Sequence, residues 1–165
     1  CPVQSMPNRQ SFIESLIAER EAFSRFLSTL QSESSALLRG NVDELLGLAE
    51  AKSRLVAQLS LLADQRRAFL GESGFSTDRV GMAEWLLVHG GSDHGRLSVA
   101  WNSLLADAEQ ARDLNRANGV LIESRLRFNQ AALTALRDAS RQATFYGPDG
   151  APELGARQGR ELGLA

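Results

Sequence analysis

Residues 37–45 read Leu-Leu-Arg-Gly-Asn-Val-Asp-Glu-Leu, and this short stretch decides how the chain folds. Gly40 predicts the end of a helix, because glycine adopts the left-handed conformation that closes many helices without steric cost. Asn41 follows as the expected N-cap of a second helix, and Glu44 stands three residues later, where a capping box requires it. So short a connection forces the two helices to lie antiparallel. The stretch therefore predicts a helical hairpin.

Both arms of this hairpin have the apolar periodicity of long helices. The first helix is expected over residues 10–39, where apolar side chains recur at alternating three- and four-residue steps. They are Ile13, Leu16, Phe23, Leu27, Leu30 and Leu37, and the polar residues Arg20 and Ser34 occupy the two remaining positions of the repeat. The second helix is expected over residues 42–70, on Leu45, Ala49, Leu55, Val56, Leu59, Leu62 and Phe69. At ~1.5 Å per residue each helix would be about 40 Å long, which predicts an elongated molecule.

The remainder of the chain predicts two more helices and a tail. A short helix is expected over residues 78–88, before the glycine-rich break at Gly90–Asp93. A third long helix without proline is expected over residues 96–143. After Tyr146 the chain is rich in glycine and poor in apolar residues, so it cannot offset its ordering entropy. We find no strand pattern and no fixed-period repeat.

The expected fold is therefore all-α: an elongated antiparallel helical bundle of three long helices plus a short connecting helix, with a flexible C-terminal tail. The expected divisions are a flexible N-terminus over residues 1–9, a helical domain over residues 10–144 and a flexible tail over residues 145–165.

Composition excludes several classes of function. A net charge of -2 and an isoelectric point near 5.7 provide no electrostatic basis for binding nucleic acid or an anionic membrane. The longest purely apolar run, Trp85–Val88, is far shorter than the ~20 residues of a membrane span. We therefore expect a cytoplasmic protein without direct membrane insertion. Cys1 is the single cysteine and cannot form an internal disulfide. A lipoprotein anchored through Cys1 stays a weaker alternative.

No residue pattern predicts catalysis, a metal or a cofactor. His89, Asp93 and His94 form the one metal-like cluster, but their spacing is loose, whereas zinc requires about four ligands in a tight tetrahedron. The carboxylates of the third helix alternate with arginines at helical neighbour spacing, which is typical of a solvated ion-pair surface. The sequence contains no phosphate loop, nucleophile elbow or Cys/His pair. We expect no enzyme and no cofactor.

The apolar stripe of the third long helix contains asparagines. It passes through Trp101, Leu105, Ala108, Asn115, Gly119, Ile122, Leu126, Asn129 and Leu133, with Asn118 beside Asn115. A buried amide destabilises a fold unless it is hydrogen-bonded, so these asparagines need a reason. They either fix the register of a helical pair or keep the stripe weakly apolar, so that a partner helix can dock and leave. Gly119 either admits a neighbouring backbone closely or is merely tolerated. The residues leave these alternatives open.

A turn follows the third helix. Gly147, Pro148, Asp149 and Gly150 fit a type I turn, and Phe145 and Tyr146 stand directly before it. The turn would end the helix in any case. Tyrosine is also an efficient interface anchor, so we favour a docking role for this segment.

Three of these segments together resemble the FlgN family of bacterial flagellar export chaperones, which act on the hook-filament junction proteins. They are Leu114–Ile122, Asn129–Leu133 and Tyr146–Gly150, and Gly40–Asp43, Leu45 and Lys52 add a weaker likeness. The resemblance covers residues 10–150. It implies a cytoplasmic, non-enzymatic chaperone with an elongated antiparallel helical fold. The implied clients are hook-associated proteins, bound through their C-terminal amphipathic segments.

The resemblance also implies the site residues. The client would contact the third helix at Asn115, Asn118, Ile122, Leu126, Asn129, Leu133 and Leu136. The cytoplasmic domain of the flagellar export gate would contact Tyr146, Gly147, Pro148, Asp149 and Gly150, with Tyr146 matching the tyrosine implicated in gate docking. The alternative is a structural or self-associating helical bundle without an export role, in which the stripe joins two copies as a homodimer.

Overall fold

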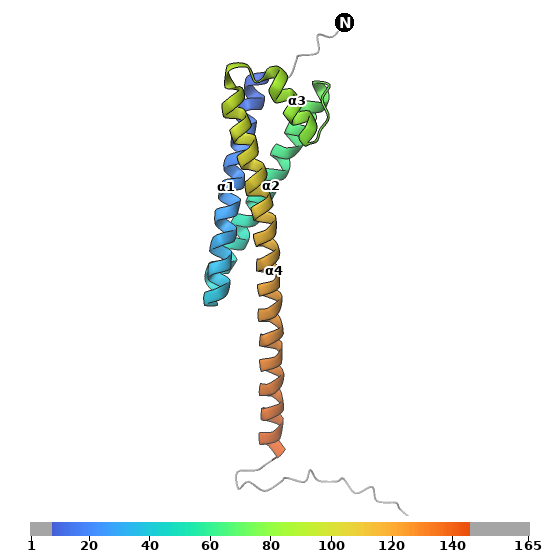
Figure 1. The fold of residues 1–165 in the computed structure, drawn as a ribbon. Coiled ribbons are helices and arrows are strands. Elements are labelled where there is room, and N and C mark those ends of the chain that lie inside the picture. The colour runs from blue at the N-terminus through green and yellow to red at the C-terminus, as the bar shows by residue number, and fades with distance from the viewer. Residues whose placement is uncertain (1–7, 146–165) are drawn as a thin grey trace, which may run out of the picture. The chain divides into compact units, whose positions relative to one another are not determined.

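The computed structural model describes residues 8–145, which form helices joined by short connections (Figure 1). The helices are α1 (Arg9–Arg39), α2 (Val42–Glu72), α3 (Arg79–His89) and α4 (His94–Phe145), with a short 3-10 helix, η1 (Gly91–Asp93), immediately before α4. The all-α class is confirmed, and no strand occurs within residues 8–145. Every predicted helix end lies within two residues of the observed one.

The described residues divide into two compact units at Leu121. The first unit contains α1, α2, α3 and the part of α4 that ends at Leu121. The second unit contains the described part of α4 from Ile122 onward.

The connection between α1 and α2 has the geometry that residues 37–45 predict, and the two helices run antiparallel side by side (Figure 1). Gly40 has a φ of 71°, in the left-handed region. Asn41 caps α2 by accepting a hydrogen bond from the Glu44 N–H at 3.3 Å. The capping box itself is incomplete, because the Glu44 carboxylate accepts from the Asn41 side-chain amide at 3.1 Å. The Asn41 backbone N–H donates to Ala36 instead, which closes α1.

The hydrophobic core lies at the far end of this hairpin, where α1 begins and α2 ends. Its buried members are Phe12, Ile13, Leu16, Leu70, Met82, Trp85, Leu86, Leu97, Trp101 and Leu104. Phe12 and Phe69 stack at 3.9 Å between ring centroids, and Trp85 meets both rings edge-on. Aromatic pairs of this kind contribute about 0.5–1.5 kcal/mol each beyond the area that they bury. The core thus joins α3 and the start of α4 to the hairpin.

Local contacts place α3 against this core. Asp78 caps α3 by accepting from the backbone N–H groups of Val80 and Gly81. The Ser76 side chain, followed by the Gly81 N–H, lowers the pKa of Asp78 below its ordinary value. Gly81 permits the tight approach of the preceding loop, since a Cβ there would overlap the Ser76 backbone. At the other end of α3, Arg9 donates to the carbonyl oxygens of His89 and Gly90.

The α2 helix is more exposed than its apolar pattern predicts. Leu59 and Leu70 are its buried residues. The expectation that Val56 and Ala49 face the core was wrong, because both are exposed. The inward positions include Lys52 and Arg66 instead, which alternate with Leu45 and Leu59 at seven-residue steps. These two cations bind buried carboxylates on α1. They therefore occupy positions on the inward face of α2 that apolar side chains were expected to occupy.

Candidate functional site: a polar clamp and an exposed helical stripe

Two buried ion pairs connect α1 to α2. Arg66 binds Glu19 through both guanidinium edge atoms, with Nε–Oε2 at 2.9 Å and Nη2–Oε1 at 3.2 Å. Lys52 binds both carboxylate oxygens of Glu33, at 3.2 and 3.1 Å. Glu19 is 1% exposed and Glu33 is 6% exposed. Carboxylates so deeply buried are tolerated only when they are paired.

Each ion pair also contacts α4 within the first unit. The Arg66 guanidinium lies 4.9 Å from the ring centroid of Trp101, in cation–π geometry. The Asn118 side-chain amide donates to Glu33 Oε2 at 2.8 Å and to the Leu30 carbonyl oxygen at 2.9 Å. We call Glu33, Lys52 and Asn118 the polar clamp. It joins three helices through hydrogen bonds and so fixes the register of α4 against the hairpin.

The polar clamp explains why one of the two asparagines, Asn118, lies in the apolar stripe of α4. Asn118 is fully buried, and its Oδ1 accepts no hydrogen bond from any residue in the described part of the chain. Asn115 is exposed, so the two asparagines of the apolar stripe do not share one environment. A three-residue step rotates the helix by about 60° away from a full turn, which is enough to move a side chain out of the contact. A Cβ at Gly119 would meet nothing within 4 Å, so close packing does not require this glycine.

Replacing Asn118 with alanine is expected to lower the free energy of unfolding by about 1–3 kcal/mol, because it removes two buried hydrogen bonds and leaves Glu33 with one donor fewer. Urea denaturation followed by circular dichroism measures the change. Asn115→Ala is the matched control, since it removes the same amide from an exposed position of the same helix and should change stability by less than about 0.5 kcal/mol. Equal effects of the two substitutions would show that the clamp does not stabilise the fold.

The other predicted client residues lie on the second unit and are exposed. The exposed fractions are 39% for Ile122, 55% for Leu126 and Leu133, and 67% for Leu136, and Asn129 between them is also exposed. We call Ile122, Leu126, Asn129, Leu133 and Leu136 the α4 stripe. Its members recur at steps of four, three, four and three residues, which places them on one side of the helix. Every side chain described from Ile122 to Gln142 is exposed. The stripe is an apolar surface of the kind that binds another protein.

The predicted gate-binding residues Tyr146, Gly147, Pro148, Asp149 and Gly150 lie outside the described residues.

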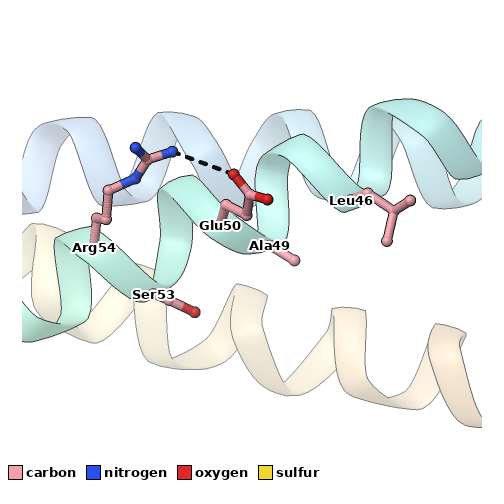
Figure 2. Close-up of a pocket in the computed structure, with 5 residues that line it drawn as sticks. All are labelled: Leu46, Ala49, Glu50, Ser53 and Arg54. Carbon is pink, nitrogen blue, oxygen red and sulfur yellow. Dashed lines mark ion pairs between the residues drawn. The ribbon is translucent and has the colours of Figure 1, made fainter.

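A shallow groove lies on α2 and has no catalytic character (Figure 2). Its lining residues are Leu46, Ala49, Glu50, Ser53 and Arg54. Figure 2 shows Ala49 and Ser53 pointing away from the ion pair that Glu50 and Arg54 form at 3.6 Å. A small-molecule site is usually an enclosed pocket with a few convergent polar groups. This open groove, whose charged residues pair with each other, does not have that form.

His89, Asp93 and His94, the metal-like cluster of the sequence, make contacts that hold the fold together. The His94 Nδ1 lies 2.8 Å from the Leu86 carbonyl oxygen, and the His89 ring stacks on Trp85 with centroids 5.6 Å apart. Asp93 lies 3.6 Å from Arg9. Between Asn8 and Phe145 no three His, Cys, Asp or Glu side chains are grouped so that they could hold a metal ion. In the same range, no helix combines the length and apolarity needed to cross a membrane.

Sequence reasoning missed the inward positions of Glu19, Glu33, Lys52 and Arg66. A signal was present in their spacing. The two acids on α1 are fourteen residues apart, and so are the two cations on α2. In an antiparallel hairpin such equal spacing brings both pairs into register at once.

Comparison with known proteins gives a consistent result. The family model described as FlgN protein matches residues 6–153. The chain is 26% identical over 139 residues to the flagella synthesis protein FlgN of Salmonella typhimurium, and the match covers 83% of this chain and 86% of that protein. The FlgN protein of Salmonella typhi matches with the same values.

A solved structure agrees with these sequence matches. The crystal structure of a flagella synthesis protein FlgN from Pseudomonas aeruginosa superposes with a TM-score of 0.63 at 25% identity, and the match covers 81% of this chain and 98% of that one. Because the family model spans most of the chain, and the Salmonella and Pseudomonas flagella synthesis proteins agree with it in sequence and in fold, this chain belongs to the FlgN family.

Proposed function

We propose that the chain is a cytoplasmic export chaperone of the flagellar type III system. It binds hook-associated proteins and delivers them to the export gate, without catalysis and without a cofactor. Family membership supports a role in building flagella. The observation that carries the chaperone proposal is the α4 stripe, an exposed apolar surface on a helix that is the only element among the described residues of its own compact unit.

The chemistry of the stripe fits a helical client. An amphipathic segment that later assembles into a filament has an apolar face that must stay covered before export. A second helix laid along the stripe would cover that face by helix-to-helix packing, with anchors at three- and four-residue spacing. Asn129 interrupts the apolar stripe between Leu126 and Leu133. An amide at such a position lowers affinity while it favours one register, which suits a complex that must later release its client.

The direct test uses the full chain and a purified full-length hook-associated protein from the same organism. Titration calorimetry and gel filtration should detect a complex, and a hook-associated protein without its C-terminal amphipathic segment should not bind. If the intact protein produces no heat and no complex, the proposal fails. If the truncated protein binds equally well, the client segment has been assigned wrongly.

Self-association is the second candidate function. The regular stripe with a central asparagine is also typical of a coiled coil, in which paired asparagines fix the register. Sedimentation equilibrium separates the two candidates. A monomer that becomes a one-to-one complex supports the chaperone, whereas a tight homodimer that excludes the hook-associated protein supports a structural role.

Gate docking is proposed for Tyr146 and the following turn. Tyr146→Ala is expected to leave the affinity for the hook-associated protein unchanged while weakening capture by the purified cytoplasmic domain of the export gate at least tenfold, because an aromatic anchor can dominate a small interface. Tyr146→Phe is the matched control, since it retains the ring. A Tyr146→Ala variant that loses its client and still binds the gate normally would reverse this division of roles.

A further inference from the structure

The charges of the second unit are arranged asymmetrically around the α4 stripe. From Ile122 to Phe145 the chain has four arginines (Arg125, Arg127, Arg137, Arg141) and two acids (Glu123, Asp138), a net charge of +2, whereas the whole chain carries -2. The segment with the exposed stripe is therefore basic within an acidic protein. Charge of one sign beside an apolar surface selects partners of the opposite sign.

One edge of the stripe is polar and basic. It consists of the residues that directly follow each stripe position and their helical neighbours: Glu123, Arg127, Gln130, Thr134, Arg137 and Arg141. Glu123 lies 3.9 Å from Arg127, so that acid already has a partner. Within residues 8–145 no acid lies in ion-pair distance of Arg137 or Arg141. Like charges four residues apart destabilise a helix slightly. Arg137 and Arg141 therefore lower the stability of α4 slightly and have no ion pair on the described part of the helix that offsets this.

The opposite edge begins with Arg125 and is otherwise apolar. It continues with Phe128, which is 73% exposed, followed by Ala132, Ala135 and Ala139, all exposed. Alanines leave room for the backbone of a second helix to approach closely. Beyond Arg125 the apolar surface therefore widens toward Phe128 and the alanines, whereas Arg137 and Arg141 border it on the other side.

We infer that the occupant of the α4 stripe is an amphipathic helix with a line of acidic residues along one edge, which pairs with Arg137 and Arg141. This inference rests on the proposed function, because it names the chemistry of the client that the same surface would bind. Arginine suits the role, since its planar guanidinium can bind a carboxylate through two hydrogen bonds.

A second copy of this chain fits the surface less well. Its own edges would present Gln130, Arg137 and the alanines to those of the first copy. The single acid on the basic edge, Glu123, is engaged by Arg127. Parallel self-pairing would thus leave Arg137 and Arg141 without a carboxylate, and antiparallel self-pairing would offer them only Glu123, which Arg127 already engages.

The test uses the full chain and two synthetic amphipathic helical peptides with identical apolar faces, one with glutamates and one with glutamines along the same edge. Calorimetry should show that the glutamate peptide binds about tenfold more tightly, and that this preference shrinks as salt is added. Arg137→Gln/Arg141→Gln should remove the preference while leaving the affinity for the glutamine peptide unchanged. The matched control is Arg112→Gln/Arg116→Gln, which removes two exposed arginines from α4 within the first unit and should retain the preference.

The outcomes separate this inference from the proposed function. Equal affinity for the two peptides overturns the inference, and a full-length hook-associated protein that still binds leaves the proposed function intact. A clear preference for the glutamate peptide together with no binding of the hook-associated protein supports the inference about charge and overturns the proposed function. A tight homodimer in sedimentation that binds neither peptide overturns the inference, because a second copy then covers the stripe.

Discussion

Replacing Arg66 with alanine is expected to lower the free energy of unfolding by about 3–5 kcal/mol, because it leaves a buried carboxylate without its counter-charge. Glu19 is 1% exposed and both of its oxygens accept from Arg66, so water cannot replace the guanidinium without opening the contact between α1 and α2. The substitution also removes the cation from the face of Trp101. Urea denaturation, followed by circular dichroism and by tryptophan fluorescence, measures the loss.

Two controls make this prediction specific. Arg67→Ala removes the neighbouring arginine, whose pair with Asp64 at 2.8 Å is on the surface, and should cost less than about 1 kcal/mol. The double variant Glu19→Leu/Arg66→Leu removes both charges, and it should recover most of the stability because no unpaired charge remains buried. An Arg66→Ala variant as stable as Arg67→Ala would mean that the Glu19–Arg66 pair does not hold the hairpin together.

Substituting Leu126 and Leu133 together with glutamine is expected to weaken binding of the hook-associated protein by about 100-fold or more. Burying a leucine side chain contributes about 1.5–3 kcal/mol, and two anchors would be lost at once. Stability should change little, because both leucines are 55% exposed and glutamine is a good helix former. Calorimetry measures the affinity, and circular dichroism verifies that the helix is retained.

The matched control for this variant lies on α2. Leu46→Gln/Leu61→Gln makes the same chemical change at two leucines that are 66% and 58% exposed, outside the α4 stripe. It should leave the affinity unchanged. Equal losses from the two double variants would show that the client does not select the stripe over other exposed leucines.

The helices and the hairpin could be predicted from the sequence because their determinants are local. Gly40 ends α1, Asn41 begins α2 and Asp78 begins α3, and each acts through hydrogen bonds or backbone angles within a few residues. Such signals do not depend on how the helices later pack. Even here one detail required the structure: the Asn41 N–H donates to α1 and not to Glu44.

The inward face of α2 could not be predicted from hydrophobicity. Lys52 and Arg66 look like surface residues until they are matched with Glu33 and Glu19 on the antiparallel helix. Asn115 and Asn118 likewise look equivalent in sequence, and only the packing of α4 on α1 decides that Asn118 is buried. Whether a polar residue is buried depends on a partner that is distant in the sequence. The periodicity of one helix carries no information about that partner.

The apolar spacing of the candidate client surface could be predicted from the sequence, but the boundary between its buried and exposed parts could not. The apolar spacing of α4 continues from buried Leu97, Trp101 and Leu104 into exposed Leu126 and Leu133 without a change in period. An amphipathic helix covered by its own fold and one left open for a partner have the same repeat. The structure was needed to find which part of α4 is left uncovered.

Hydrogen exchange of the full chain, with and without a full-length hook-associated protein, tests the central claim most directly. Backbone amides exchange quickly when a helix has no packing partner, and they slow down when a second helix covers it. The chaperone proposal predicts that client binding slows exchange in the residues from Ile122 to Phe145, with smaller changes in α1 and α2. A complex that protects α1, α2 or α3 while exchange between Ile122 and Phe145 stays as fast as in the free protein would contradict it.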